Sequence, residues 1–260
     1  MTDTDSASAA ADDQDEFYIG YAALMPPRTA RFISTAVIAT GCGVAALAVL
    51  FAAGHTRLEG GAFEFGRPQS FSGAIVERPY PVLKLDGREG RDSSLLLVAP
   101  GKHGADPLVA GLDGHHVSLT GTRILRGGRT MVEVEPASIA ASTTSAARDR
   151  PAAASAGVSG EPTTMTGEVV DSKCFMGVMV PGAGKTHADC AALCLRGGIP
   201  PALYVRDRGD QSALVLLAGS QSEAIGPRLS EFAGDAVEVT GILERTSEWP
   251  VVRVESIRRK

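Results

Sequence analysis

Three cysteines and a histidine lie within the 21 residues from Cys174 to Cys194, and Cys42 is the only other cysteine in the 260-residue chain. His187, Cys190 and Cys194 have the spacing i, i+3 and i+7, which places them on one face of a helix, within about 60° of one another. Cys174 comes from the preceding segment and would complete a set of four. Thiolate and imidazole are the ligands of four-coordinate zinc, and soft thiolates equally suit copper(I). The stretch therefore predicts a metal site for zinc or copper.

The same cysteines allow two other chemistries. A disulfide from Cys174 to Cys190 or Cys194 would leave one thiol spare, whereas a Cys190–Cys194 bridge is disfavoured inside a regular helix. Cys190 and Cys194 could also form a redox-active thiol pair. Three cysteines leave at least one thiol unpaired, and an unpaired thiol in an exported domain can be a reactive one. The sequence leaves these alternatives open.

Two carboxylates flank the cluster and could orient His187 through a hydrogen bond, as groups outside the metal ligands commonly do. They are Asp171 and Asp189. The chain has no Ser/His/Asp or paired-carboxylate pattern typical of a hydrolase. The segment 182–186 lacks the first glycine of a phosphate-binding loop. We therefore expect a binding or accessory protein rather than an enzyme.

Residues 32–54 contain no charged side chain. This segment is long enough to cross a bilayer as a helix. About 30 residues precede this segment, too many for a cleaved signal peptide. Arg28 and Arg31 flank its N-terminal side and favour a cytoplasmic N-terminus. We predict a single-pass protein of the bacterial inner membrane, with residues 58–260 on the exported, periplasmic side.

The first 31 residues form the predicted cytoplasmic tail. Residues 1–16 are acidic and low in complexity, which predicts disorder. The aromatic segment that follows is Phe17–Arg31. It is either an aromatic belt at the membrane interface or, together with the membrane helix, a docking segment for another membrane protein. The net charge of −5 gives no support for nucleic-acid binding.

Two parts of the chain repeat at a constant offset of 120 residues, without a gap from Leu95 to Glu135. The matched positions include Leu96 and Leu216, Pro107 and Pro227, Thr120 and Thr240, and Gly121 and Gly241. Glycine and proline in register are rarely a coincidence, so we interpret the repeat as an internal duplication.

Each repeat has short alternating or fully apolar runs that predict β-strands. The runs lie at 71–76, 94–98, 117–121 and 131–135, and again at 165–170, 213–217, 237–241 and 251–255. A short helix at 222–232 precedes the fourth strand of the second repeat. The pattern predicts a mainly β protein with two tandem OB-like barrels, at 68–139 and 164–260, and a five-stranded sandwich is the alternative.

A Ser/Ala/Pro-rich linker at 140–163 separates the two repeats and predicts that the barrels fold independently. The second repeat has 26 more residues between its first and central strands than the first. These extra residues are the Cys/His segment, so the cluster is an insertion in a scaffold that forms without it.

Residues 164–258 combine Gly167-Glu-Val-Val-Asp-Ser-Lys-Cys174, a later histidine, Cys190-x3-Cys194 and a glycine-bounded strand that ends at Gly241. This pattern, D-x-x-C…H…C-x3-C, resembles that of a group of small exported bacterial OB-like domains. The resemblance implies an exported OB-like domain with no assigned activity.

These observations predict a membrane-anchored, exported accessory or binding protein of the cell envelope. It would bind a metal ion or serve a membrane redox complex. The alternative is a thiol-redox or metal-delivery protein in which Cys190 and Cys194 act directly.

Overall fold

The computed structural model describes residues 25–56, 60–87, 94–141, 160–206, 213–245 and 249–260. The chain forms two units, residues 1–58 and 59–260, which are taken separately below. The predictions for the acidic tail, for the aromatic segment up to residue 24 and for residues 142–159 of the linker fall outside the described residues.

The first unit holds one helix, α1 (Pro27–Thr56). It starts at a proline, which is favourable at a first helical position because that N–H has no helical acceptor. The segment Pro27–Ala53 is long and apolar enough to cross a membrane. At 1.5 Å per residue it measures about 40 Å, against about 30 Å of hydrocarbon. The predicted apolar helix at 32–54 is confirmed and extends further at its N-terminal end.

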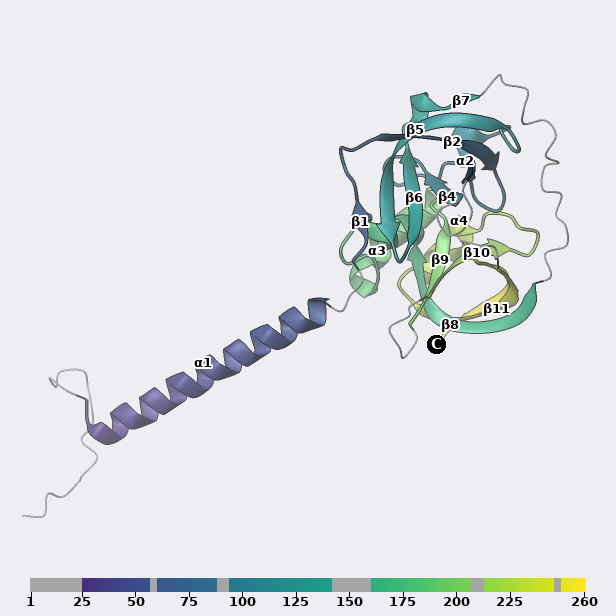
Figure 1. The fold of residues 1–260 in the computed structure, drawn as a ribbon. Helices are drawn as coiled ribbons and strands as arrows, with labels where there is room; N and C mark the ends of the chain where they lie inside the picture. Colours follow the sequence, from purple (N-terminus) through teal and green to yellow (C-terminus); the bar gives the residue numbers. More distant parts are fainter. Residues whose placement is uncertain (1–24, 57–59, 88–93, 142–159, 207–212, 246–248) are drawn as a thin grey trace, which may run out of the picture. The chain divides into compact units, whose positions relative to one another are not determined.

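The second unit contains two β-barrels (Figure 1). The first barrel is built from β2 (Gln69–Val76), β3 (Val82–Leu85), β4 (Ser94–Val98), β5 (His116–Arg126) and β6 (Arg129–Val134). The strands pair in the order β5-β2-β3-β4-β6, and β6 pairs back with β5 to close the barrel. Helix α2 (Asp106–Val109) connects β4 to β5, while the short strands β1 (Ala62–Phe63) and β7 (Ala140–Ala141) pair with β5.

The second barrel repeats this topology strand for strand. Its strands are β8 (Glu161–Asp171), β9 (Pro201–Val205), β10 (Ala213–Gly219), β11 (Ala236–Glu244) and β12 (Val251–Arg259). They close in the order β10-β12-β11-β8-β9. Helix α4 (Gly226–Leu229) and a 3-10 turn, Ser230–Phe232, precede β11, at the place predicted for a helix. A closed five-stranded barrel with a helix before its fourth strand is an OB-like fold, so the sandwich alternative is wrong.

The duplication extends to the hydrogen-bond register. Leu96 of β4 lies opposite Met131 in the parallel pair with β6. At the same offset of 120, Leu216 lies opposite Val251. The matched Gly121 sits where a side chain would collide, because a Cβ there would lie 2.6 Å from a carbonyl oxygen of the partner strand. The shared glycine is therefore a requirement of the barrel.

The apolar runs in β4 and β10 are buried on both faces. Successive side chains of a strand point to opposite sides. Leu95 and Leu97 belong to the interior of the first barrel, whereas Leu96 and Val98 belong to a second cluster. In β10, Leu214, Leu216 and Ala218 join that same cluster, while Val215 and Leu217 fill the second barrel. The two barrels thus share one hydrophobic core in addition to their own interiors.

Polar contacts reinforce this shared core. The hydroxyl of Tyr80, from the first barrel, donates to the carbonyl of Leu217 at 2.5 Å. The indole N–H of Trp249, from the second barrel, donates to the carbonyl of Ser94 at 3.3 Å. The structure therefore differs from the prediction of independent barrels, because each barrel leaves apolar surface that the other covers.

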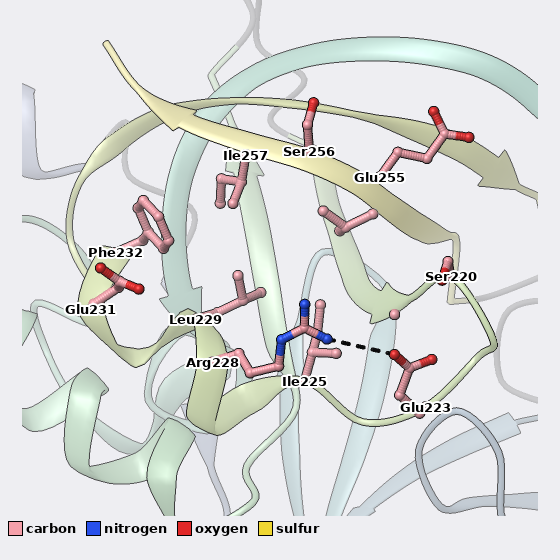
Figure 2. A pocket seen from close by; sticks show the side chains of 12 residues that line it. Ser220, Glu223, Ile225, Arg228, Leu229, Glu231, Phe232, Glu255, Ser256 and Ile257 are labelled. Atoms are coloured by element: carbon pink, nitrogen blue, oxygen red, sulfur yellow. Dashed lines mark ion pairs between the residues drawn. The ribbon is translucent and has the colours of Figure 1, made fainter.

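The limits of the barrels also differ from those predicted. Strand β8 starts at Glu161 rather than at residue 164, and Ala140 already pairs in β7. The Cys/His insertion occupies residues 172–200, between β8 and β9. On the second barrel, α4 and β12 also border a cavity (Figure 2).

Candidate functional site

The first half of the insertion positions Cys174. Strand β8 ends at Asp171, and a π-helical turn, Cys174–Val178, follows. The carboxylate of Asp171 accepts a hydrogen bond from the backbone N–H of Cys174 at 2.8 Å. The turn is fixed further by Arg126 of the first barrel, which donates to the carbonyl of Phe175. Cys174 is therefore held at the base of the insertion by contacts from both barrels.

The second half positions the other three residues. A 3-10 turn, Lys185–His187, leads into α3 (Ala188–Arg196), which carries Cys190 and Cys194. Alanine and leucine favour this helix. It ends where the N–H of Gly197 donates to the carbonyl of Leu193 at 3.0 Å. The helix predicted from the spacing of His187, Cys190 and Cys194 is confirmed for the two cysteines, whereas His187 belongs to the turn that precedes it.

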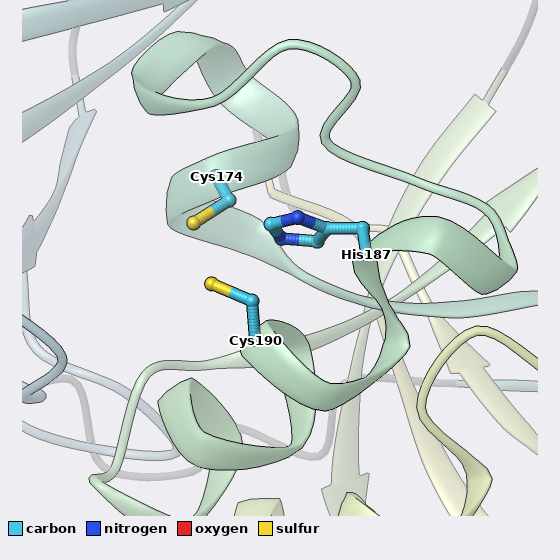
Figure 3. Close-up of side chains that lie close together, drawn as sticks. All are labelled: Cys174, His187 and Cys190. Atoms are coloured by element: carbon cyan, nitrogen blue, oxygen red, sulfur yellow. The ribbon is translucent and has the colours of Figure 1, made fainter.

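Cys174 and Cys190 converge with His187 (Figure 3). The Sγ atoms of Cys174 and Cys190 and a ring nitrogen of His187 all lie within 4.8 Å of one another. A second group, which shares Cys174, consists of the Sγ atoms of Cys174 and Cys194 and an oxygen of Asp171, within the same limit. Convergence of the three cysteines and His187, predicted from their spacing, is confirmed.

Asp171 has the orienting role predicted for it. Its Oδ2 lies 3.1 Å from Nε2 of His187, and its side chain is fully buried. This hydrogen bond raises the pKa of His187, against the opposing effect of burial. The carboxylate also lies among the possible ligand atoms, which the sequence did not indicate. Asp189, by contrast, is exposed and belongs to neither group, so its predicted role beside His187 is wrong.

A lysine from the first barrel completes the site. Lys102 follows β4, and its ammonium group lies 2.8 Å from Sγ of Cys190 and 3.8 Å from Sγ of Cys194. The contact with Cys190 raises the pKa of Lys102. Sequence reasoning missed Lys102, because no spacing rule relates it to cysteines about 90 positions away.

The thiols are unequal. Cys174 and Cys194 are buried, whereas Cys190 is half-buried. The hydrogen bond between Cys174 and Cys194 raises the pKa of Cys174 and lowers that of Cys194. All three are free thiols in this structure, as is Cys42, which is exposed on α1. The structure therefore does not show the alternative disulfide.

Comparison of the sequence with protein-family models finds no match, and comparison with curated proteins finds none either. The resemblance of residues 164–258 to small exported OB-like domains thus stays a prediction.

Proposed function

We infer that the protein binds a thiophilic metal ion, best matched by zinc, as a non-catalytic accessory protein anchored in the bacterial cell envelope. The observation that carries this proposal is the convergence of Cys174, His187, Cys190 and Cys194 at one place between two structural elements. Three sulfurs and one imidazole nitrogen form a donor set of structural zinc sites.

Three of the four proposed ligands need only a small adjustment to accept zinc. With Zn–S bonds of about 2.3 Å, tetrahedral ligand atoms lie about 3.8 Å apart. The limit of 4.8 Å that holds among Cys174, His187 and Cys190 therefore requires a closure of about 1 Å or less, within reach of side-chain rotation. Cys194 lies within that limit of Cys174 and would have to approach the other two ligands as well. The hydrogen bond that His187 donates to the carboxylate of Asp171 favours zinc over copper(I), because a carboxylate that orients a ligating histidine is a common feature of zinc sites. Lys102 would offset part of the thiolate charge.

The second candidate function is thiol–disulfide exchange. It is favoured by the contact of the Lys102 ammonium group with the half-buried Cys190, which places a positive charge beside a partly accessible sulfur. Attack by Cys190 on a partner disulfide would form a mixed disulfide. Cys174, whose Sγ atom lies within 4.8 Å of that of Cys190, would then attack the Cys190 sulfur, release the partner as a thiolate and close an internal disulfide.

Metal analysis and thiol titration on the full chain, purified in detergent under reducing conditions, distinguish the two functions. A zinc protein should carry one zinc per chain, and its thiols should react only after chelation. The variants His187→Ala and Cys194→Ser should bind zinc at least about tenfold more weakly. Cys42→Ser is the matched control, because it removes a cysteine outside the cluster.

A chain that takes up no zinc, and in which mild oxidation consumes two of the three clustered thiols, would refute metal binding and support the exchange function. Retention of zinc by His187→Ala with unchanged affinity would remove His187 from the ligand set.

Membrane anchoring with an exported C-terminal unit is part of the proposal. It is supported by the length and apolar composition of Pro27–Ala53 and by Arg28 and Arg31 on the N-terminal flank. Protease added to intact spheroplasts should degrade residues 58–260. Protection of this unit in spheroplasts but not in lysed cells would contradict the orientation.

A further inference from the structure

Among the described residues, the possible ligand atoms of the Cys/His site form two overlapping groups rather than one. The first group contains Cys174, His187 and Cys190, whose ligand atoms lie within 4.8 Å of one another (Figure 3). The second contains Asp171, Cys174 and Cys194, within the same limit. Cys174 belongs to both groups. The structure thus outlines two adjacent positions that share one sulfur.

The second group is compact enough to close around an ion. Any three points within 4.8 Å of one another share a centre that is at most about 2.8 Å from each of them. Zinc bonds measure about 2.3 Å to sulfur and about 2.0–2.2 Å to a carboxylate oxygen. A movement of about 0.5–0.8 Å at each donor atom, or less, would therefore give bonding distances.

Asp171 keeps the acceptor capacity that a ligand needs. Its side chain is fully buried. One oxygen accepts the N–H of Cys174 at 2.8 Å, and the other lies 3.1 Å from Nε2 of His187. A carboxylate has about four lone-pair sites, so about two remain after these contacts. The carboxylate can therefore bind an ion while it still orients His187.

The charges of the site favour two ions. The three cysteines and Asp171 carry four negative charges when all of them bind metal, whereas a ligating histidine is neutral. One zinc ion compensates two of these charges, and Lys102 offsets one more from 2.8 Å and 3.8 Å. A remaining charge would be costly, because Asp171, Cys174 and Cys194 are all buried. A second divalent ion balances the four donors in full, and the exposed Lys102 stays solvated.

We propose that the protein binds a second thiophilic divalent ion at Asp171, Cys174 and Cys194, beside the ion of the proposed function. The sulfur of Cys174 bridges the two ions. This inference rests on the proposed metal binding and gives Cys194 two roles. With one ion bound, Cys194 is the fourth ligand of that ion; with two bound, it belongs to the second.

Native mass spectrometry of the full chain in detergent counts the ions. Metal-free, reduced protein is loaded with excess zinc, and the free zinc is then removed. The single zinc expected in the purified chain is the first ion, and added zinc should raise the count to two. One ion at saturation would overturn this inference and leave the proposed function standing, whereas a chain that binds none would refute both.

Two substitutions remove donors of the second position. Cys194→Ser and Asp171→Asn should each lower the count at saturation from two ions to one. Cys42→Ser is the matched control outside the cluster and should keep two. Far-ultraviolet circular dichroism identifies the variants that are folded, and retention of two ions by a folded Cys194→Ser or Asp171→Asn chain would overturn the proposal.

Cobalt(II) tests the shared sulfur without any substitution. One equivalent should give the electron paramagnetic resonance signal of an isolated high-spin ion. A second equivalent should lower this signal, because two cobalt ions that share a thiolate couple antiferromagnetically. A signal that doubles would show two separate ions and would overturn the bridge by Cys174, and with it the proposal.

Discussion

Replacement of Lys173 by methionine should destabilise the whole second unit, although Lys173 lies next to Cys174 rather than in either barrel. The Lys173 side chain is only 2% exposed and reaches from the insertion into the first barrel. Its ammonium group donates to the carbonyls of Ala99 and Gly101, both at 2.8 Å, and lies 2.5 Å from a carboxylate oxygen of Glu133. Methionine keeps the length and the apolar stem of the side chain but removes all three interactions.

The expected loss follows from the groups left behind. Removal of one partner of a buried ion pair costs about 3–5 kcal/mol, because the other charge stays buried without compensation. Glu133 retains 21% exposure of its side chain, so water can partly replace the lysine. We therefore expect a loss of about 3 kcal/mol, at the lower end of that range. In a unit of about 200 residues, this corresponds to a fall in Tm of about 6–12 °C.

The assay is urea unfolding of the full chain, followed by fluorescence of Trp249 and by far-ultraviolet circular dichroism. The matched control is Lys185→Met, because Lys185 also pairs with a carboxylate, that of Asp235, but is 76% exposed. The control should change the free energy of unfolding by less than about 1 kcal/mol. Equal effects of the two variants would refute the assignment of Lys173 as a buried link. Separate transitions of the two barrels in the wild-type chain would refute the shared core.

Two smaller perturbations probe other links. Tyr80→Phe should lower stability by about 1–2 kcal/mol in urea unfolding, because it leaves the buried carbonyl of Leu217 without its donor, and an unchanged midpoint would contradict that contact. The hydrogen bond from Lys185 lowers the pKa of Asp235 below its ordinary value of 3.8, so the stability contributed by Asp235 is present above that pH and is lost as the pH falls through the folded-state pKa. Asp235→Asn should therefore lose less stability than the wild type between about pH 5 and pH 2, and parallel acid curves for the two proteins would contradict this.

The repeat and the strand patterns were sufficient to predict both barrels, because a strand's alternation reports which of its faces is buried. The spacing of Cys190 and Cys194 placed both on one face of a helix for the same local reason, since a helix fixes the relative directions of residues four apart. His187 joins them from the turn that precedes the helix. Strands β3 and β9 are short and were not assigned to residues from the sequence.

The association of the barrels was not predicted, although one signal of it was present. The run Ser94–Val98 is apolar at nearly every position, and such a strand must be covered on both faces. Alternation within a single barrel leaves one face toward solvent, so the continuous run required a second covering surface. Sequence periodicity cannot say which surface that is. For the same reason the reach of Lys102 to Cys190 was not foreseeable: it depends on how the two barrels pack.

The contact of Lys102 with the thiols has a genetic consequence. The half of the coding sequence that holds every cluster cysteine does not encode the complete site, because one side chain comes from the half that holds none. Recombination that replaced one half of the coding sequence by a diverged copy would break the site, although neither half would carry a new mutation. Second-site suppressors of a defect at Cys190 should accordingly map not only around α3 but also to a codon 88 positions upstream. The two repeats thus contribute side chains to one site and have to be inherited together, and neither is a spare copy of the other.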